Sequence, residues 1–331
     1  MQQRRLGQSG PVTSALGLGL MGMSDFYGTA DEAESIATIH AALDAGVTLM
    51  DTGDFYGVGH NESLLGRALA QSSRLEQAIV SLKFGALRDP AGGFVGYDAR
   101  PKSVKNFLAY SLQRLGLNHV DIYRPARLDP EVPIEDTIGA IAELQQAGYV
   151  RHIGLSEVGV ETIRRAAATA TISDLQIEYS LLSRGIEDAI LPAARELGIG
   201  ITAYGVLSRG LITGDWRRPA PGEFDFRAIS PRFQEGNVER NLALAEALGR
   251  VAEARGISRA QAAIAWVAAQ GNDIVPLIGA RRRDRLAESL GALGVILSPD
   301  DLAAIEQAVL KGAAAGGRYP DQQLAFMDSE R

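Results

Sequence analysis

Three side chains that can move a proton are predicted to meet at the ends of two neighbouring strands. Asp51 and Tyr56 belong to the segment Asp51-Thr-Gly-Asp-Phe-Tyr56-Gly, which begins where an apolar run over residues 48–50 ends. Lys83 directly follows the next such run, over residues 78–82. If these runs are adjacent parallel strands, their carboxyl ends bring an acid, a phenol and an ammonium group together.

Such a group could perform acid catalysis on a carbonyl compound. A tyrosine phenol, with its ordinary pKa of about 10, is a weak acid at neutral pH. We expect the Lys83 ammonium to lower the pKa of Tyr56, and Asp51 to keep Lys83 charged and oriented. The phenol could then donate a proton to a carbonyl oxygen as hydride reaches the carbon. The alternative is structural, because a lone buried lysine often forms only an ion pair and a lone tyrosine often only packs.

Eight short apolar runs alternate with amphipathic stretches, a pattern that predicts βα units and a parallel sheet. The predicted strands cover residues 15–18, 48–50, 78–82, 120–123, 152–155, 175–177, 200–203 and 274–278. The predicted helices cover residues 31–45, 104–115, 134–147, 160–168, 186–197 and 237–255. Periodicity alone does not separate a closed barrel from an open sheet. Eight strands, and no phosphate-binding Gly-x-Gly-x-x-Gly turn at the first crossover, favour an α/β fold of the (β/α)₈ TIM barrel type.

The chain, residues 1–331, is predicted to form a single barrel domain, because its length lies within the range of such barrels. Residues 208–231 are rich in glycine and proline and predict a long loop after the seventh strand, over the mouth of the barrel. The segment after about residue 312 is expected to be a poorly packed, peripheral extension.

Composition argues against several classes of protein. A net charge of −7 disfavours nucleic-acid binding, which needs an excess of lysine and arginine. The chain has no cysteine, and its four histidines show no ligand spacing, so no metal site is expected. Neither a signal peptide nor an apolar run long enough to cross a membrane is visible, so we expect a cytoplasmic protein. Oligomeric state cannot be predicted, although no heptad pattern or apolar patch argues against a monomer.

The motifs resemble those of the aldo-keto reductase superfamily. The segment from Asp51 to Gly57 is similar to the family's Asp-Thr-Ala-x-x-Tyr-Gly motif, and Lys83 matches the family lysine. Further segments match in the family's order: Asn61-Glu62-x-Leu-Leu-Gly66, Ser111-Leu-x-Arg-Leu-Gly116, Gly154-Leu-Ser156, Gln176-x-Glu-Tyr179, Ala203-Tyr204 and Ile278-Gly-Ala-Arg281. The resemblance implies a barrel that reduces an aldehyde or ketone to an alcohol with NADPH. It assigns Asp51, Tyr56 and Lys83 to three of four catalytic positions, with Tyr56 as the general acid.

The fourth catalytic position departs from the family pattern. The family usually ends its fourth strand with Gln-His before a segment like Arg-x-Asp, whereas this chain has Ala126 in place of the histidine. That histidine normally donates a hydrogen bond that orients the substrate carbonyl. Water, substrate or another side chain could fill the gap, the preferred substrate could differ, or catalysis could be lost. We hypothesise that the site works without the histidine; the alternative is a non-catalytic NADPH-binding regulatory or sensor protein.

Arg124 is a candidate to stand near the gap, because it lies two residues before Ala126 and shares its strand face. It could equally be a salt-bridged structural arginine. Arg127 is expected to point the other way. Apolar side chains in nearby loops are expected to form the substrate wall, namely Met21, Phe26, Tyr27 and Phe55.

The resemblance also implies where NADPH binds. Arg281-Arg-Arg-Asp-Arg285 follows the eighth strand and opens a helix, where backbone N–H groups and guanidinium groups suit a phosphate. This segment could instead be a solvated charged turn. In the family, the corresponding segment binds the adenosine 2′-phosphate. Tyr204 is expected to stack on the nicotinamide, and Ser156 and Gln176 to bind its carboxamide, with Glu157 in place of a common asparagine. The expected cofactor residues are Gly19, Met21, Asp51, Ser156, Gln176, Tyr204, Gly205, Leu207, Gly210, Gly279, Ala280, Arg281, Arg285, Glu288 and Ser289.

Overall fold

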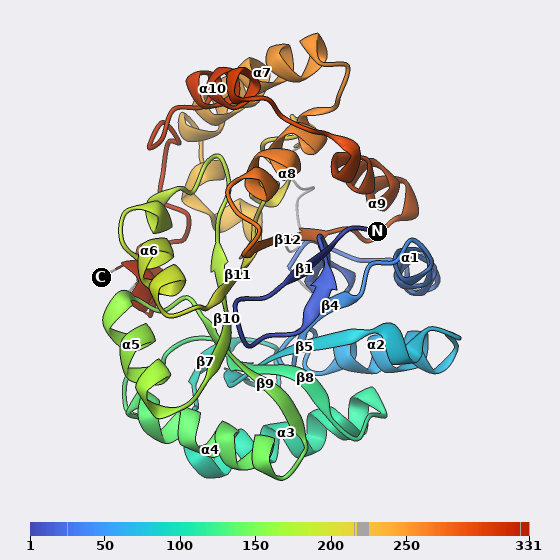
Figure 1. The fold of residues 1–331 in the computed structure, drawn as a ribbon, viewed down its shortest axis with the longest axis vertical. Helices are drawn as coiled ribbons and strands as arrows, with labels where there is room; N and C mark the ends of the chain where they lie inside the picture. The colour runs from blue at the N-terminus through green and yellow to red at the C-terminus, as the bar shows by residue number, and fades with distance from the viewer. Residues whose placement is uncertain (25, 215, 217–224, 325, 331) are drawn as a thin grey trace.

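The fold is a closed barrel of parallel strands surrounded by helices (Figure 1). It is seen in a computed structural model that describes residues 1–24, 26–214, 216, 225–324 and 326–330. Within these residues the barrel strands are β3 (Gly17–Gly19), β4 (Leu49–Gly53), β5 (Ile79–Phe84), β8 (Val120–Pro125), β9 (Val150–Ser156), β10 (Ile172–Glu178), β11 (Gly200–Tyr204) and β12 (Ile274–Gly279). They neighbour one another in sequence order, and β12 pairs with β3 to close the barrel. The predicted TIM barrel and its eight strands are confirmed.

Helices cover the outside of the barrel (Figure 1). They are α1 (Glu32–Asp44), α2 (His60–Ala70), α3 (Pro101–Leu115), α4 (Ile134–Gln146), α5 (Val160–Thr169), α6 (Ile190–Glu196), α7 (Asn237–Ala254), α8 (Arg259–Ala269), α9 (Arg283–Leu290), α10 (Pro299–Ala308) and the short α11 (Asp321–Leu324). Local signals define several of their ends. The Asp31 carboxylate accepts the Glu34 N–H at 2.9 Å at the start of α1, and Gly116 ends α3 with a left-handed φ of 68°. The predicted helix over 186–197 is shorter, because a 3₁₀ turn, Gly185–Glu187, precedes α6.

An antiparallel hairpin of β1 (Gln3–Arg5) and β2 (Val12–Ser14) precedes the first barrel strand. The Arg4 guanidinium donates to the carbonyl oxygens of Ala268 and Ile274, which ties the hairpin to β12 and the end of α8. Leu6, which is fully buried, packs against Leu49, Ile122 and Val275. The hairpin therefore closes the amino end of the barrel and leaves the carboxyl end free for a site.

The C-terminal tail, residues 313–330, packs across the opposite end of the barrel. Asn241 of α7 exchanges hydrogen bonds with the backbone of Ala315, and the Asp328 carboxylate accepts the Gly159 N–H at 2.7 Å. Phe326 contacts Phe94 of β7 (Phe94–Tyr97), whose hairpin partner is β6 (Ala86–Arg88). The expectation of a poorly packed extension is therefore wrong, because partners distant in the sequence hold the tail.

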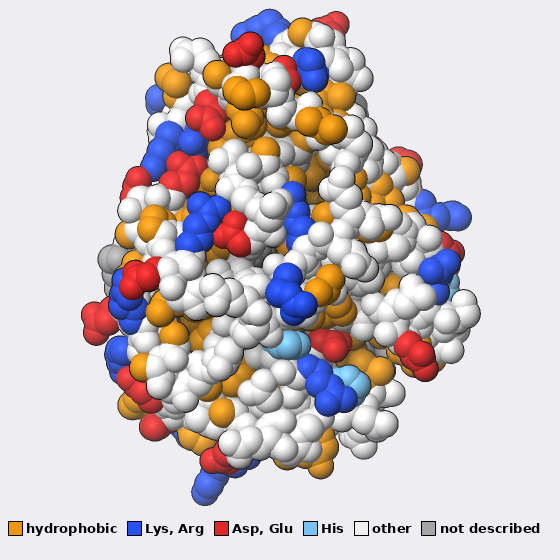
Figure 2. Space-filling view, in the orientation of Figure 1, with side chains coloured by type: hydrophobic (Ala, Val, Ile, Leu, Met, Phe, Trp, Pro, Cys, Tyr) orange, Lys and Arg blue, Asp and Glu red, His pale blue; other side chains and the backbone are white. Residues whose placement is uncertain are grey.

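The long loop predicted over residues 208–231 falls partly on residues 215 and 217–224, which lie outside the described residues. Its described parts include three 3₁₀ turns, Ser208–Gly210, Phe226–Ile229 and Pro231–Phe233. No helix among the described residues is long and apolar enough to cross a membrane. On the face seen in Figure 2, basic and acidic side chains are interspersed.

Candidate active site

Asp51, Tyr56 and Lys83 meet at the carboxyl end of β4 and β5. The register pairs Asp51 with Ser81, so Lys83 lies two residues beyond and its ammonium ion-pairs with Asp51 Oδ1. Asp51 Oδ2 accepts hydrogen bonds from Ser81 Oγ at 2.8 Å and from Gln176 Nε2 at 2.7 Å. The Lys83 Nζ lies 5.2 Å from the centre of the Tyr56 ring. The structure thus brings together the three residues that the motif predicted.

Burial dominates the protonation of this group. Burial and then the charge of Asp51 raise the pKa of Tyr56 well above its ordinary value, although Arg127 acts in the opposite sense. Burial lowers the pKa of Lys83 to about 8, although Asp51 opposes this change. The expectation that Lys83 lowers the pKa of Tyr56 is therefore wrong, because desolvation of the phenolate outweighs it. Tyr56 keeps its proton at neutral pH, which is the form that a general acid requires.

A cavity of about 960 Å³ opens beside Tyr56 at the mouth of the barrel. Its wall includes every predicted site residue except Arg124: Gly19, Met21, Phe26, Tyr27, Asp51, Phe55, Tyr56, Lys83, Ala126, Ser156, Gln176, Tyr204, Gly205, Leu207, Gly210, Gly279, Ala280, Arg281, Arg285, Glu288 and Ser289. These residues come from the carboxyl ends of the strands and the loops that follow, which is where barrel enzymes carry their sites. The cavity therefore extends from the Tyr56 group to the arginine segment after β12.

Of the two alternatives for Arg124, its place in the site is wrong and its role as a salt-bridged structural arginine is confirmed. Arg124 is fully buried and its Nη2 lies 3.0 Å from Asp174 Oδ2 of β10, which also accepts a hydrogen bond from Thr202 of β11. Arg124 is thus a structural ion pair inside the barrel. Ala126 does line the cavity, and so does Arg127, which was expected to face away. The alternation of side chains fails here because β8 ends at Pro125.

The wall of the cavity contains polar atoms suited to a bound cofactor. Ser156 Oγ is buried and has no hydrogen-bond partner among the described residues, an arrangement that a ligand would satisfy. Gln176, by contrast, already donates a hydrogen bond from its amide Nε2 to Asp51 Oδ2. The Tyr204 hydroxyl donates to Glu157 Oε1 at 2.7 Å and lies 2.9 Å from the Tyr319 hydroxyl.

The arginine segment joins β12 to α9 and α1. Arg283 pairs with Glu34 of α1, and Arg282 pairs with Asp284, so these two guanidinium groups are engaged by acids. Arg281 donates to the carbonyl oxygen of Tyr27 at 2.8 Å, and Arg285 Nη1 lies 3.2 Å from Glu288 Oε2. Arg281 and Arg285 line the cavity, as the phosphate prediction requires.

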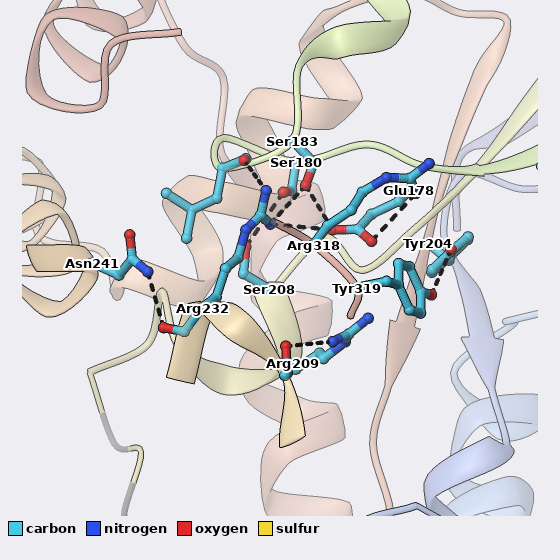
Figure 3. A network of polar contacts seen from close by, with 12 residues as sticks. Glu178, Ser180, Ser183, Tyr204, Ser208, Arg209, Arg232, Asn241, Arg318 and Tyr319 are labelled. Carbon is cyan, nitrogen blue, oxygen red and sulfur yellow. Dashed lines mark hydrogen bonds and ion pairs between the residues drawn. The ribbon is translucent and has the colours of Figure 1, made fainter. Parts of the chain in front are cut away.

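The sequence did not reveal the contribution of the C-terminal tail to the cavity wall. Figure 3 shows Tyr319 of the tail beside Tyr204, with Arg318 and Arg209 nearby. The Tyr319 ring centre lies 4.5 Å from the Arg209 guanidinium and 5.9 Å from that of Arg127. Phe326 also lines the cavity. No local pattern in the tail indicates these contacts; for Arg127, the Arg-x-Asp segment was the available signal.

The profile of the Aldo/keto reductase family matches residues 15–310. The chain belongs to the aldo/keto reductase family. It is 38% identical to "Aldo-keto reductase yakc [NADP(+)]" of Schizosaccharomyces pombe, over 98% of this chain and 97% of that protein.

Two solved structures of aldo-keto reductases resemble this one. The glycerol dehydrogenase AKR11B4 from Gluconobacter oxydans is 30% identical, with a TM-score of 0.84, over 93% of this chain and 95% of its own. The holo form of the aldo-keto reductase AKR11C1 from Bacillus halodurans is 26% identical, with a TM-score of 0.77, over 93% of this chain and 96% of its own. The residues matched by the family profile include all eight strands of the barrel.

Proposed function

We propose that this aldo-keto reductase reduces an aldehyde or ketone to an alcohol with NADPH, using Tyr56 as the general acid. The observation that carries the proposal is the position of the buried Tyr56 beside the Lys83–Asp51 ion pair in the wall of the cavity. Bound NADPH would supply the hydride for the carbonyl carbon.

The residues of the chain then act on the carbonyl oxygen. Tyr56 donates its phenolic proton to that oxygen, and the Lys83 ammonium stabilises the negative charge that develops on the phenol. Asp51 holds Lys83 in place, and its second oxygen is satisfied by Ser81 and Gln176. Met21, Phe26 and Phe55 form an apolar wall that excludes water from the reacting groups.

We propose that Ala126 occupies the place of the family histidine and that the site works without it. Loss of one donor to the substrate oxygen costs on the order of 10²–10³ in rate when nothing replaces it. The absence of the histidine favours the second candidate, an NADPH-binding sensor without catalysis. The retained Asp51, Tyr56 and Lys83 favour the enzyme, because a sensor has no need of a proton donor beside a buried ammonium group.

The choice of NADPH over NADH rests on Arg281 and Arg285. Both line the far end of the cavity beside α9, and a guanidinium group binds the adenosine 2′-phosphate, which NADH lacks. The name of the yeast relative includes NADP(+), in agreement with this assignment.

We expect Arg285→Ala to raise the Kd for NADPH about tenfold or more and to leave the Kd for NADH nearly unchanged. The distant, exposed Arg164→Ala serves as the control; equal losses for both cofactors would contradict the assignment.

NADPH consumption at 340 nm with a panel of aldehydes and ketones tests the proposed activity. Turnover that depends on the carbonyl compound supports the reductase. Tight NADPH binding without turnover across the panel would instead support the sensor.

A further inference from the structure

Arg127 is a cation in the cavity wall that has no acidic partner within the described part of the chain. It directly follows Ala126 after the end of β8 and lines the cavity. Its Nη1 donates to the carbonyl oxygen of Ala126 at 2.6 Å, and its guanidinium lies 5.9 Å from the centre of the Tyr319 ring. Among the described residues, no carboxylate lies within 4.0 Å of it, so its other N–H donors are available to a ligand. A poorly solvated cation without a partner is costly, which favours a bound anion.

Several cations that line the cavity are already paired with acids. Lys83 pairs with Asp51, and Arg227 pairs with Asp225. Arg209 is a second guanidinium without an acid partner among the described residues, but it lies between Leu207 and Gly210, which are expected to bind the cofactor. Arg281 belongs to the segment expected to bind the 2′-phosphate. Arg127 is in neither segment, so its anion can come from a molecule other than the cofactor.

Arg127 lies at the reacting end of the cavity. It follows Ala126, whose N–H donates at 2.8 Å to the carbonyl oxygen of Phe84, the residue after Lys83. Its charge also acts to lower the pKa values of Tyr56 and Lys83. Tyr97, Tyr204 and Tyr319 are close enough to interact with it electrostatically, and Glu157 also faces it but is already paired with Arg318. An anion beside Arg127 would thus lie near the carbonyl group that Tyr56 protonates.

We propose that the substrate carries a carboxylate close to its carbonyl group and that Arg127 binds this carboxylate. The planar fork of the guanidinium matches a carboxylate with two parallel hydrogen bonds. One unpaired guanidinium balances the single charge of a carboxylate, whereas a phosphate would bring nearly two negative charges. Arg127 is then a specificity residue, and this inference rests on the proposed reductase function.

Matched pairs of small substrates test the proposal. The 3- and 4-carboxybenzaldehydes differ from the corresponding carbamoylbenzaldehydes in charge but hardly in shape. For at least one isomer we expect the wild type to have a kcat/KM about 10- to 100-fold higher for the acid than for the amide. Arg127→Gln should remove this preference, so that its kcat/KM values for the acid and the amide lie within about threefold of each other, while Arg127→Lys should keep part of the preference. Arg164→Gln, which alters an exposed ion pair, is the control and should behave as the wild type.

The ratio of kcat/KM for the acid to kcat/KM for the amide separates binding of the carboxylate from a purely structural role. A variant that merely disturbs the structure lowers both kcat/KM values alike and leaves their ratio unchanged. The proposal is overturned if no isomer of the acid is preferred over its amide, or if the preference survives in Arg127→Gln. If the holoenzyme reduces neither compound, the panel of aldehydes and ketones decides the reductase function, and the Kd values of the acid and the amide for the NADP⁺ complex decide the present proposal. A higher affinity for the acid that depends on Arg127 supports it, and equal affinities overturn it.

Discussion

Arg318, near the end of the chain, binds both carboxylate oxygens of the fully buried Glu157, which follows β9. Its Nη1 lies 2.9 Å from Oε1 and its Nη2 lies 2.6 Å from Oε2. Glu157 also accepts hydrogen bonds from the hydroxyl groups of Tyr204 and Ser329. Burial would raise the pKa of Glu157, but the charge and hydrogen bonds of Arg318 hold it at about 2. One ion pair thus fixes the tail over the cavity beside Tyr204.

Arg318→Met should destabilise the protein strongly. Removal of one partner of a buried ion pair leaves an uncompensated charge and costs about 3–5 kcal/mol. The free energy of unfolding from urea titrations, compared with that of Arg164→Met, measures the effect, because loss of an exposed pair costs less than about 1 kcal/mol. Since the pKa of Glu157 is depressed in the folded state, its contribution is complete above about pH 4.5 and is lost as the pH falls toward 2. Equal stability of the two variants at pH 7 would contradict this account of the tail.

The pH dependence of reduction should follow Lys83. With a pKa of about 8, the Lys83 ammonium loses its proton as the pH rises through 8, while Tyr56 keeps its own. We expect kcat/KM for reduction to be constant below about pH 7 and to fall above about pH 8. Lys83→Arg retains a charge at all these pH values, so its lower activity should not show the decline. A decline that is identical in this variant would show that another group titrates.

Ala126→His tests whether the missing donor limits the rate. An imidazole at this position could donate to the carbonyl oxygen, so we expect kcat for a neutral aldehyde to rise about tenfold or more. Ala126→Leu adds similar bulk without a donor and should give no such increase. If Ala126→His leaves kcat unchanged while NADPH still binds, water or another group already fills the gap.

Much of the barrel could be predicted because its strands are buried on both faces and read as apolar runs. The motif around Asp51 and Tyr56 located the cluster of Asp51, Tyr56 and Lys83, since spacing along β4 and β5 sets where the carboxyl ends meet. Protonation was harder to predict: the sequence places Lys83 near Tyr56, but the extent of burial decides the direction of the pKa change.

The wrong predictions concern contacts that sequence periodicity does not encode. Arg124 was placed in the site because strand alternation does not reveal its partner Asp174, 50 residues away. Arg127 was expected to face away because the end of β8 at Pro125 could not be located. The tail appeared peripheral because its Gly- and Ala-rich start carries no periodic signal, whereas Arg318 and Tyr319 act through partners more than 100 residues earlier.

The most direct test of the central claim is the rate of NADPH oxidation at 340 nm by Tyr56→Phe in the presence of an aldehyde that the wild type reduces. This substitution removes only the phenolic proton donor, so kcat should fall about 10²- to 10⁴-fold while the Kd for NADPH stays within about threefold. Tyr110→Phe, at an exposed position of α3, should match the wild type. A Tyr56→Phe enzyme that keeps the wild-type kcat would contradict the assignment of Tyr56 as the general acid.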